Sequence, residues 1–482
     1  MFATLAFKEL KAIALSPKFS VTFGVCSALI LLSIFAGIRE YQTALANWQT
    51  ATALADQQAT EASSWRQFSY HAEREPDPMM IFVTGLSNDI GRWSRIATDE
   101  SIKLRHSPYS DDPIFAFFRT IDFSFITLVV LSLFAILFTY DAINGERESG
   151  TLKLVLSNAV PRATYVLAKL AGAWLALVAP LLAPILIGLL LVILAGIPLS
   201  GALWLKIITL IGVSLALVSL FVTFGVFISA LTRHSSVSFL MSLVIWVGIV
   251  LVIPRAGVMA AGALQPVPRV AEIEGQRDGF AKDLWAEFYA GMDERFKQER
   301  ENGFDPDDDA AMWERMQRED SLRKFVEARI YEYEERLLAD LEVKKAAQEQ
   351  LAFTLSRISP GSAYQLAMMR LAGNDITLKQ RYQRAMSDYR DRWTEFVTAK
   401  QEETGEHGGF VSVSIDSEKG LTIGTGSDDE ALDVSGMPRF TAPKQAFAEV
   451  FAPIIPDLGI LGFGILVSFA GAFVAFLRYD VR

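Results

Sequence analysis

Long apolar stretches alternate with charged segments along the 482 residues of this chain. Each apolar stretch contains few or no charged residues, and each is close to the roughly 20 residues that a helix needs to cross about 30 Å of hydrocarbon. This pattern predicts an all-α membrane protein with six transmembrane helices. In chain order, the predicted spans are residues 19–38, 119–140, 170–197, 203–232, 235–253 and 458–477.

Two of the intervening segments have the composition of soluble protein. Residues 39–118 separate the first two spans, and residues 254–457 separate the last two. The longer segment, at about 200 residues, is large enough to form a domain with its own core. We expect it to be a large, mostly helical extracytoplasmic domain, and the shorter segment to be a smaller one on the same side.

Apolar residues recur at helical spacing in two parts of the longer segment, residues 307–359 and 377–400. The second part carries a heptad-like seam formed by Tyr382, Met386, Tyr389, Trp393 and Phe396. The two parts could pack against each other as a self-contained helical hairpin with a buried seam, or against a partner subunit. The alternative is a surface that handles substrate. Between residues 402 and 439 the composition shifts to Gly, Ser and Asp, which indicates a small β-hairpin or a loop.

The positions of Lys and Arg predict how the spans are oriented, because positive residues are enriched in short cytoplasmic loops. If the N-terminus is cytoplasmic, the inner segments are residues 1–18, 141–169, the turn at Arg233, and 478–482. All of these contain Lys or Arg, whereas the short turn between the third and fourth spans contains neither. We therefore expect an inner-membrane protein with cytoplasmic N- and C-termini, and both large segments in the periplasm of a Gram-negative cell.

The N-terminal residues 1–18 are expected to form an interfacial helix, with Lys8 and Lys11 facing anionic lipid and apolar residues in the headgroup region. A ragged N-terminus is the alternative. The first span is longer than the 7 to 15 apolar residues of a signal peptide, which disfavours cleavage after it. The one cysteine, Cys26, lies in this span, so no disulfide can form within the chain.

The charged turn at residues 141–169 is the strongest candidate for a functional site. Two acidic residues, Glu146 and Glu148, stand close together, and an apolar helical pattern follows Gly150. Acidic side chains stabilise the N-terminal end of a helix, and Gly permits a sharp change of chain direction. We predict a short surface helix around residues 146–156 that docks a cytoplasmic partner.

Three strings in this region resemble the permease subunits of type 2 ABC exporters: E-R-E-S-G-T-L at residues 146–152, L-S-N-A-V-P-R at 156–162 and A-K-L-A-G at 168–172. In that family the equivalent loop contains the coupling helix that contacts a separate ATPase subunit. The resemblance therefore implies that this segment couples the chain to an ATPase. The residues implicated are Glu146, Arg147, Glu148, Gly150, Thr151 and Leu152.

The large outer segment resembles the branch of this family that includes the permease for nitrous oxide reductase maturation. The similar strings are L-S-R-I-S-P-G-S-A-Y at residues 355–364 and L-A-G-N-D at residues 371–375. The insertion before the last span is also typical of that branch. The resemblance thus extends over nearly the whole chain.

The resemblance implies a permease subunit in membrane lipid that dimerises, with itself or with a related permease, and docks two ATPase subunits. ATP and Mg would bind to the ATPase, so this chain would hold no cofactor and catalyse no reaction itself. It would couple ATP hydrolysis to export or outer delivery of an unidentified substrate. One alternative is a mechanical role, in which the outer domain moves a periplasmic partner without transmembrane cargo; another is a membrane scaffold.

The sequence lacks recognisable patterns for other chemistry. The spacing from Gly145 to Gly150 is that of a phosphate loop, but the Lys that would reach the terminal phosphates is missing. The four His have no metal-binding spacing, and the acidic run at residues 305–309 lacks the Gly and Glu of a calcium loop. The acidic excess of the outer domain disfavours nucleic acid as a partner. We therefore assign no catalytic or metal-binding residue.

One polar pair falls outside these patterns. Arg119 and Asp122 lie three residues apart at the outer end of the second span. Residues at this spacing meet on one face of a helix. We expect them to form a structural ion pair or to contact cargo at the outer mouth of the transport path.

Overall fold

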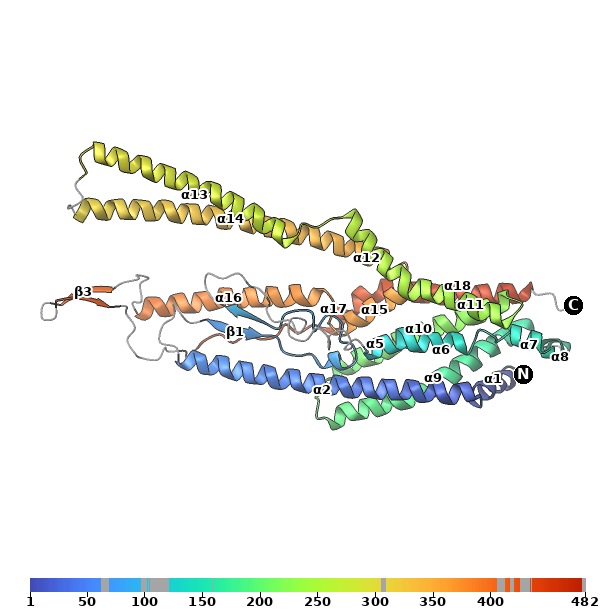
Figure 1. The fold of residues 1–482 in the computed structure, drawn as a ribbon. Coiled ribbons are helices and arrows are strands. Elements are labelled where there is room, and N and C mark those ends of the chain that lie inside the picture. The colour runs from blue at the N-terminus through green and yellow to red at the C-terminus, as the bar shows by residue number, and fades with distance from the viewer. Residues whose placement is uncertain are drawn as a thin grey trace. The chain divides into compact units, whose positions relative to one another are not determined.

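The computed structural model describes residues 1–61, 69–96, 102, 104, 121–158, 160–304, 309–404, 412–416, 420–424, 434 and 436–478. The chain divides into two compact units, which are coloured by residue number in Figure 1. The first unit contains residues 1–251 and 359–482, and the second contains residues 252–358.

Helices form most of the first unit. Before the unit boundary they are α1 (Phe2–Ala14), α2 (Pro17–Glu61), η1 (Pro78–Ile81), α5 (Phe123–Phe125), η2 (Ile126–Leu131), α6 (Ser132–Leu137), α7 (Asn144–Glu148), α8 (Thr151–Ser157), α9 (Arg162–Leu194), α10 (Gly201–Leu231), α11 (Ser235–Val247) and its continuation η3 (Gly248–Val252). After the second unit they are α15 (Pro360–Leu371), α16 (Thr377–Thr404), α17 (Phe447–Phe451), η4 (Ala452–Ile454) and α18 (Ile455–Leu477).

Among the described residues, five helices are long and apolar enough to cross a membrane. They are Pro17–Glu61, Arg162–Leu194, Gly201–Leu231, Ser235–Leu264 and Phe447–Leu477. Each of these overlaps a predicted span. The remaining predicted span, residues 119–140, overlaps the shorter apolar helix Phe123–Leu137, and its first two residues lie outside the description. A count of six spans therefore stays a prediction.

The helix that contains the first predicted span continues well beyond that span. α2 runs for 45 residues, whereas the predicted span ends at residue 38. Residues 39–61 contain neither Gly nor Pro and include many Ala and Gln, which favour a helix. The sequence therefore has no signal that would end the helix at the predicted membrane boundary.

The largest core of the first unit lies where α10 packs against α18, and where α9 packs against α1 and α2. On α10, the residues Val213, Leu217 and Phe221 recur every four positions and are fully buried. Such spacing places them on one face of the helix. In lipid, close packing between helices supplies the stabilisation that exclusion of water supplies in a soluble protein.

A second hydrophobic cluster joins the end of α2 to α16. The predicted seam on α16 is confirmed, since four of its five residues are buried and Phe396 packs at the edge. The seam packs against Ala55 of α2 and against two short strands, β1 (Tyr70–Glu73) and β2 (Trp93–Ile96). The antiparallel pairing runs from Tyr70 opposite Ile96 to Glu73 opposite Trp93.

Strands are thus present in a chain that was predicted to be all-α. Besides β1 and β2, an antiparallel hairpin is formed by β3 (Ser412–Asp416) and β4 (Gly420–Gly424), with Ser412 opposite Gly424. This hairpin confirms one of the two alternatives for residues 402–439. β1 and β2 were not predicted, because four-residue strands carry too short an alternation to be recognised.

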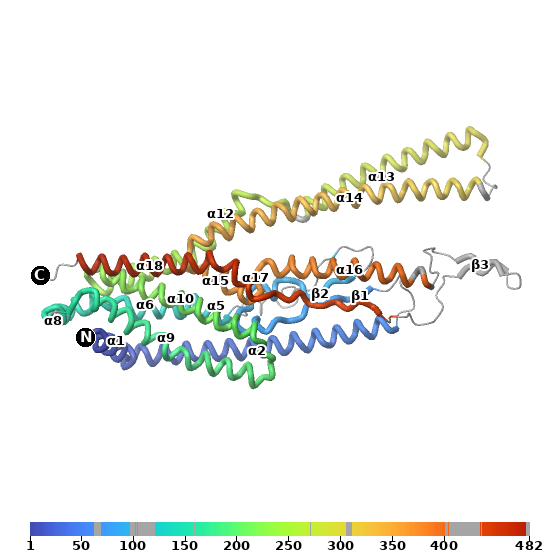
Figure 2. The backbone as a smooth tube through the Cα atoms, turned by 180° about the vertical axis from the view of Figure 1, so that it is seen from behind, coloured from blue at the N-terminus to red at the C-terminus, as the bar shows by residue number. Residues whose placement is uncertain are grey.

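The second unit consists of α12 (Ile253–Leu264), α13 (Val270–Glu301) and α14 (Asp309–Ser356). α13 and α14 run side by side, as Figure 2 shows. Phe280 stacks on Tyr333 with ring centroids 4.1 Å apart, and Arg295 Nη2 lies 2.8 Å from Glu319 Oε2. The helix predicted at residues 307–359 is therefore confirmed. Its partner in a hairpin is α13, so the interpretation that it pairs with the helix at residues 377–400 is wrong, because the seam of that helix packs against α2, β1 and β2.

Candidate functional site

The charged turn folds into two short helices, α7 and α8, at the same end of the first unit as α1 (Figure 1). α7 ends at Glu148 and α8 begins at Thr151. Gly150 between them has φ = 76°, a left-handed conformation that side chains larger than hydrogen disfavour. The prediction of one helix around residues 146–156 is therefore wrong, because Gly150 divides it.

Two hydroxyl groups close the corner between α7 and α8. Ser149 Oγ and Thr151 Oγ1 each donate to the backbone carbonyl of Glu146 at 3.2 Å. The two hydroxyls also lie 2.9 Å apart, within hydrogen-bonding distance. They supply partners for a carbonyl that the end of a helix leaves unpaired. The corner is therefore held in one geometry.

Glu146 connects the turn to two other helices. Its carboxylate accepts hydrogen bonds from Tyr165 Oη at 2.7 Å and from Lys169 Nζ at 3.0 Å, both on α9. It also accepts one from Lys8 Nζ of α1 at 3.0 Å. The Glu146 side chain is only 15% exposed. This residue, predicted to face a partner, instead ties α7 to α1 and α9.

Lys169 is the other centre of this network. Its side chain is 7% exposed, and its ammonium lies 2.7 Å from Glu9 Oε2 as well as 3.0 Å from Glu146. Burial alone would raise the pKa of the Glu146 carboxyl, but the Lys169 charge and the hydrogen bonds outweigh it and lower that pKa. A buried charge is tolerated when it is paired and hydrogen-bonded in this way.

α1 lies unusually close to α9 beside this network. A Cβ atom at Gly172 would lie 2.6 Å from Glu9 Cβ and 2.7 Å from the carbonyl oxygen of Ala6. Real Cβ atoms do not approach other heavy atoms so closely, so only Gly fits here. Gly172, which belongs to the A-K-L-A-G string, thus allows Glu9 to reach Lys169.

The other side of α7 is attached to α10 and α11. Asn144 is buried, and its side chain binds Thr232 Oγ1 at 3.0 Å and Ser229 Oγ at 3.1 Å. Glu148 accepts hydrogen bonds from Ser235 N at 2.9 Å and Ser235 Oγ at 2.7 Å, at the start of α11. These bonds hold the pKa of Glu148 below its ordinary value.

α8 carries both buried and exposed members of the predicted site. Leu152 is 2% exposed and belongs to the main core. Thr151 is exposed, as are three residues that the sequence analysis did not select, and we call these three the α8 face: Lys153, Leu154 and Ser157. Leu154 is 66% exposed. In the sequence, the only sign that Leu154 is exposed is its position two residues after the buried Leu152, which places it on another face of α8.

The remaining predicted residues have different placements. Arg147 is half-buried on α7. Asp122 accepts hydrogen bonds from the backbone N–H groups of Phe125 at 2.8 Å and Thr84 at 3.0 Å, and so caps the start of α5. Arg119, its predicted partner, lies outside the described residues. Among the described residues, the Asp122 carboxylate therefore acts as a helix cap that also binds the backbone at Thr84.

Within the described ranges, no group of three or more His, Cys, Asp or Glu side chains could hold a metal ion. Residues 305–308 of the acidic run lie outside these ranges, and Asp309 is the first residue of α14. The hydrogen bonds and ion pairs of the charged turn connect α7 to α1, α9, α10 and α11.

A family model described as ABC-2 family transporter protein matches residues 4–481. The match includes the charged turn, all the apolar helices and both long polar segments, residues 39–118 and 254–457. No curated protein matches the sequence.

Proposed function

The chain belongs to the ABC-2 transporter family, and we propose that it is the permease subunit of a transporter driven by a separate ATPase. The family match covers nearly the whole chain. Membership makes this a membrane subunit without catalytic activity of its own, and it implies an ABC ATPase as partner in general. In the proposal, ATP and Mg bind to that ATPase.

We assign docking of the ATPase to the α8 face rather than to the acidic residues of α7. The exposed Leu154 offers an apolar contact, and Lys153 and Ser157 beside it are also exposed. Glu146, in contrast, is occupied by three hydrogen bonds within the chain. Protein interfaces commonly place apolar side chains at their centre and polar groups at their rim.

The observation that carries the proposal is the attachment of α7 to four helices. Glu146 binds α1 and α9, Asn144 binds the end of α10, and Glu148 binds the start of α11. A displacement of α8 would pass through the corner at Gly150 into α7 and from there to all four. This arrangement would transmit movement of an ATPase to the membrane-spanning helices.

The proposal also includes the remaining expectations drawn from the sequence. The chain would dimerise with itself or with a related permease, bind two ATPase subunits, and lie in the inner membrane with cytoplasmic termini. It would belong to the branch with a large outer insertion and would export or deliver a substrate. Each of these follows from the resemblance and from the distribution of Lys and Arg.

The mechanical alternative draws on α2. This helix continues beyond the predicted first span, and its far end, at Ala55, packs into the same cluster as Trp393 and Tyr389 of α16. Movement at the membrane would therefore reach the outer part of the first unit without passage of cargo. A periplasmic partner bound there would be moved by each ATP cycle.

The docking proposal is tested by replacing Leu154 with Asp. The tagged full-length chain is purified from membranes of its host, and the ABC ATPase recovered per permease is quantified by mass spectrometry. A charge at a buried apolar contact should reduce recovery of the ATPase by at least about tenfold, since loss of a hot spot costs about 2 kcal/mol or more.

The matched control is Val343→Asp, because Val343 is 69% exposed on α14, away from the charged turn in the sequence. This variant should recover the ATPase at the wild-type level. Recovery from Leu154→Asp equal to that of the control would contradict docking on the α8 face. A wild-type preparation that contains no ABC ATPase would contradict the permease function itself.

A further inference from the structure

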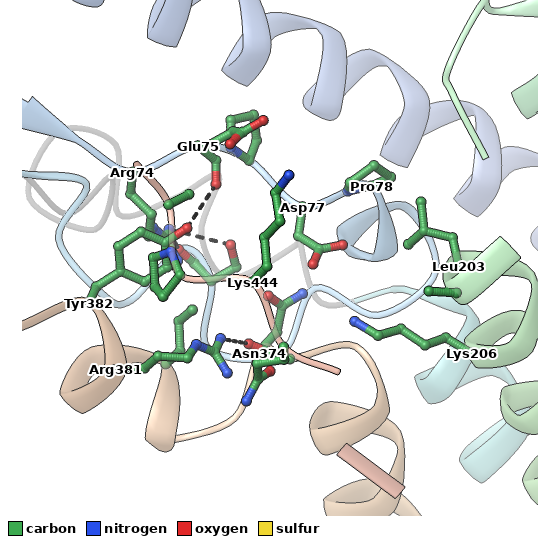
Figure 3. A pocket seen from close by; sticks show the side chains of 18 of the residues that line it. Arg74, Glu75, Asp77, Pro78, Leu203, Lys206, Asn374, Arg381, Tyr382 and Lys444 are labelled. Carbon is green, nitrogen blue, oxygen red and sulfur yellow. Dashed lines mark hydrogen bonds between the residues drawn. The ribbon is translucent and has the colours of Figure 1, made fainter. Parts of the chain in front are cut away.

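A cavity of about 280 Å³ lies beside the start of α10 (Figure 3). The start of α10 follows the C-terminal end of α9, whereas the charged turn precedes the N-terminal end of α9. The cavity is enclosed by four parts of the first unit: the segment after β1, the N-terminal turns of α10, the segment around α16 and the chain before α17. The charged residues that line it are Arg74, Glu75, Asp77, Lys206, Arg381 and Lys444.

The net charge of the residues that line this cavity is positive, whereas that of the whole chain is negative. Four of its six charged residues are cationic and two are acidic, whereas the whole chain has a formal net charge of −10. The acidic pair, Glu75 and Asp77, is exposed at the rim. The cations gather around a space that is large enough for a small anionic group and its attached atoms.

Lys206 is the most unusual residue of the cavity. It is only 6% exposed, and it makes no hydrogen bond or ion pair with any residue that the structure describes. Figure 3 shows its side chain extending from α10 toward the space beside Asp77 and Asn374. The Lys206 Nζ atom is not among the buried polar atoms that lack a partner, so it reaches the open space of the cavity. An ammonium that faces a cavity without a counter-charge from the described chain is a donor available to an anion from outside.

Arg381 adds a second set of unused donors. Its Nη2 atom donates to the carbonyl of Gly373 at 2.9 Å, while Nε and Nη1 are buried without a hydrogen-bond partner. Nε and Nη1 lie on different edges of the guanidinium, so each could donate a charge-assisted hydrogen bond to a separate oxygen of an anion. Lys206 and Arg381 come from different helices, so they present donors to the cavity from different directions.

The remaining groups hold the cavity in shape. Arg74 Nη2 donates to the carbonyl of Ser87 at 2.5 Å, and its guanidinium lies 6.0 Å from the centre of the Tyr382 ring. Burial lowers the pKa of Arg74 to about 10, which still leaves it charged at neutral pH. Ser200 accepts a hydrogen bond from Leu203 N at 3.3 Å and caps α10, whose N-terminal end adds partial positive charge.

We propose that this cavity binds a phosphate group, supplied either by an anionic lipid headgroup or by a free phosphate. Phosphate has oxygens in a tetrahedral arrangement, so it can accept from Lys206 and Arg381 from different directions at once. The position at the end of an apolar helix is the depth of lipid headgroups. The proposal does not depend on an ATPase or on the α8 face.

The test measures phosphate binding to the purified full-length chain in detergent, without an ATPase. One arm uses radiolabelled inorganic phosphate at equilibrium. The other uses native mass spectrometry in micelles that contain dioleoylphosphatidylglycerol or, for comparison, dioleoylphosphatidylcholine. Binding in the first arm identifies free phosphate as the source, and selective retention of phosphatidylglycerol identifies the lipid headgroup; either result supports the site.

The variants Lys206→Gln and Arg381→Gln should each weaken the observed binding by about tenfold or more, because each removes a charge-assisted hydrogen bond. The matched control is Lys282→Gln, an exposed residue of α13, which should bind as the wild type does. If one of the two buried variants fails to fold, the rim variant Lys444→Gln replaces it, with a smaller expected loss. Binding in neither arm, or binding that the folded variants leave unchanged, would overturn the proposal.

Discussion

Two lysines with equal burial mark opposite ends of the α9–α10 pair. Lys169, near the start of α9, and Lys206, near the start of α10, are both 6% exposed. Lys169 lies 2.7 Å from Glu9 and 3.0 Å from Glu146, so its charge is neutralised within the chain. Lys206 has no such carboxylate within the described part of the protein.

The difference separates a joint from a binding site. At one end, a cation and two carboxylates are packed together and fix three helices to each other. At the other end, a cation faces a cavity of about 280 Å³. Burial of a charge therefore does not by itself indicate function; the presence or absence of an internal counter-charge does.

Replacement by Met should change the free energy of unfolding differently at the two lysines. The larger effect is expected for Lys169→Met. Removing one partner of a buried ion pair leaves the Glu9 and Glu146 carboxylates without their main counter-charge. We expect the free energy of unfolding to fall by about 3 kcal/mol. The measurement is the unfolding midpoint in detergent micelles, with the exposed Lys282→Met as control. A loss no larger than that of the control would show that the joint is not held by this pair.

Lys206→Met should instead leave the stability of the phosphate-free protein unchanged or raise it by about 1 kcal/mol, since an ammonium without a counter-charge in the chain is replaced by an apolar group of similar length. Addition of phosphate or phosphatidylglycerol should raise the unfolding midpoint of the wild type but not of this variant. The same detergent measurement reports both quantities. A destabilisation as large as that of Lys169→Met would mean that Lys206 is a structural residue.

The smallest effect is expected from acidification, which removes the charge of Glu146 in the joint. The pKa of Glu146 is lowered in the folded protein from its ordinary value of 4.5. Its contribution to stability is therefore complete above that ordinary value and is lost as the pH falls through the lowered pKa. The unfolding midpoint of the wild type should fall between about pH 5 and pH 3 more steeply than that of Glu146→Gln.

The control for this pH series is Glu287→Gln, which removes an exposed carboxyl of α13. Its profile should follow the wild type. Parallel profiles for the wild type and Glu146→Gln would indicate that Glu146 does not stabilise the joint through its charge.

Features that depend on local pattern were predictable from the sequence. The apolar stretches, the seam on α16 and the hairpin near residues 412–424 all follow from periodicity within a few turns or strands of the chain. The position of the break between α7 and α8 was visible as Gly150. Its effect was underestimated because the helical pattern resumes directly after it.

Features that depend on distant parts of the chain were not predictable. Glu146 looked like a surface residue, because its partner Lys8 lies 138 positions away. The cavity at Lys206 is formed by four segments that are far apart in the sequence, so no local pattern indicates it. The length of α2 was missed for a different reason: the membrane boundary was inferred from hydropathy, and a helix need not end where its apolar residues end.

The uninterrupted course of α2 gives it the properties of a lever. Its 45 residues extend over about 68 Å, roughly twice the thickness of the hydrocarbon layer. A tilt of about 5° at one end would therefore displace the other by about 6 Å. A small rotation of α2 where it packs against α9 would become a large displacement of its other end, beside α16. A Gly or Pro introduced in the middle of α2 would bend the helix and reduce that displacement.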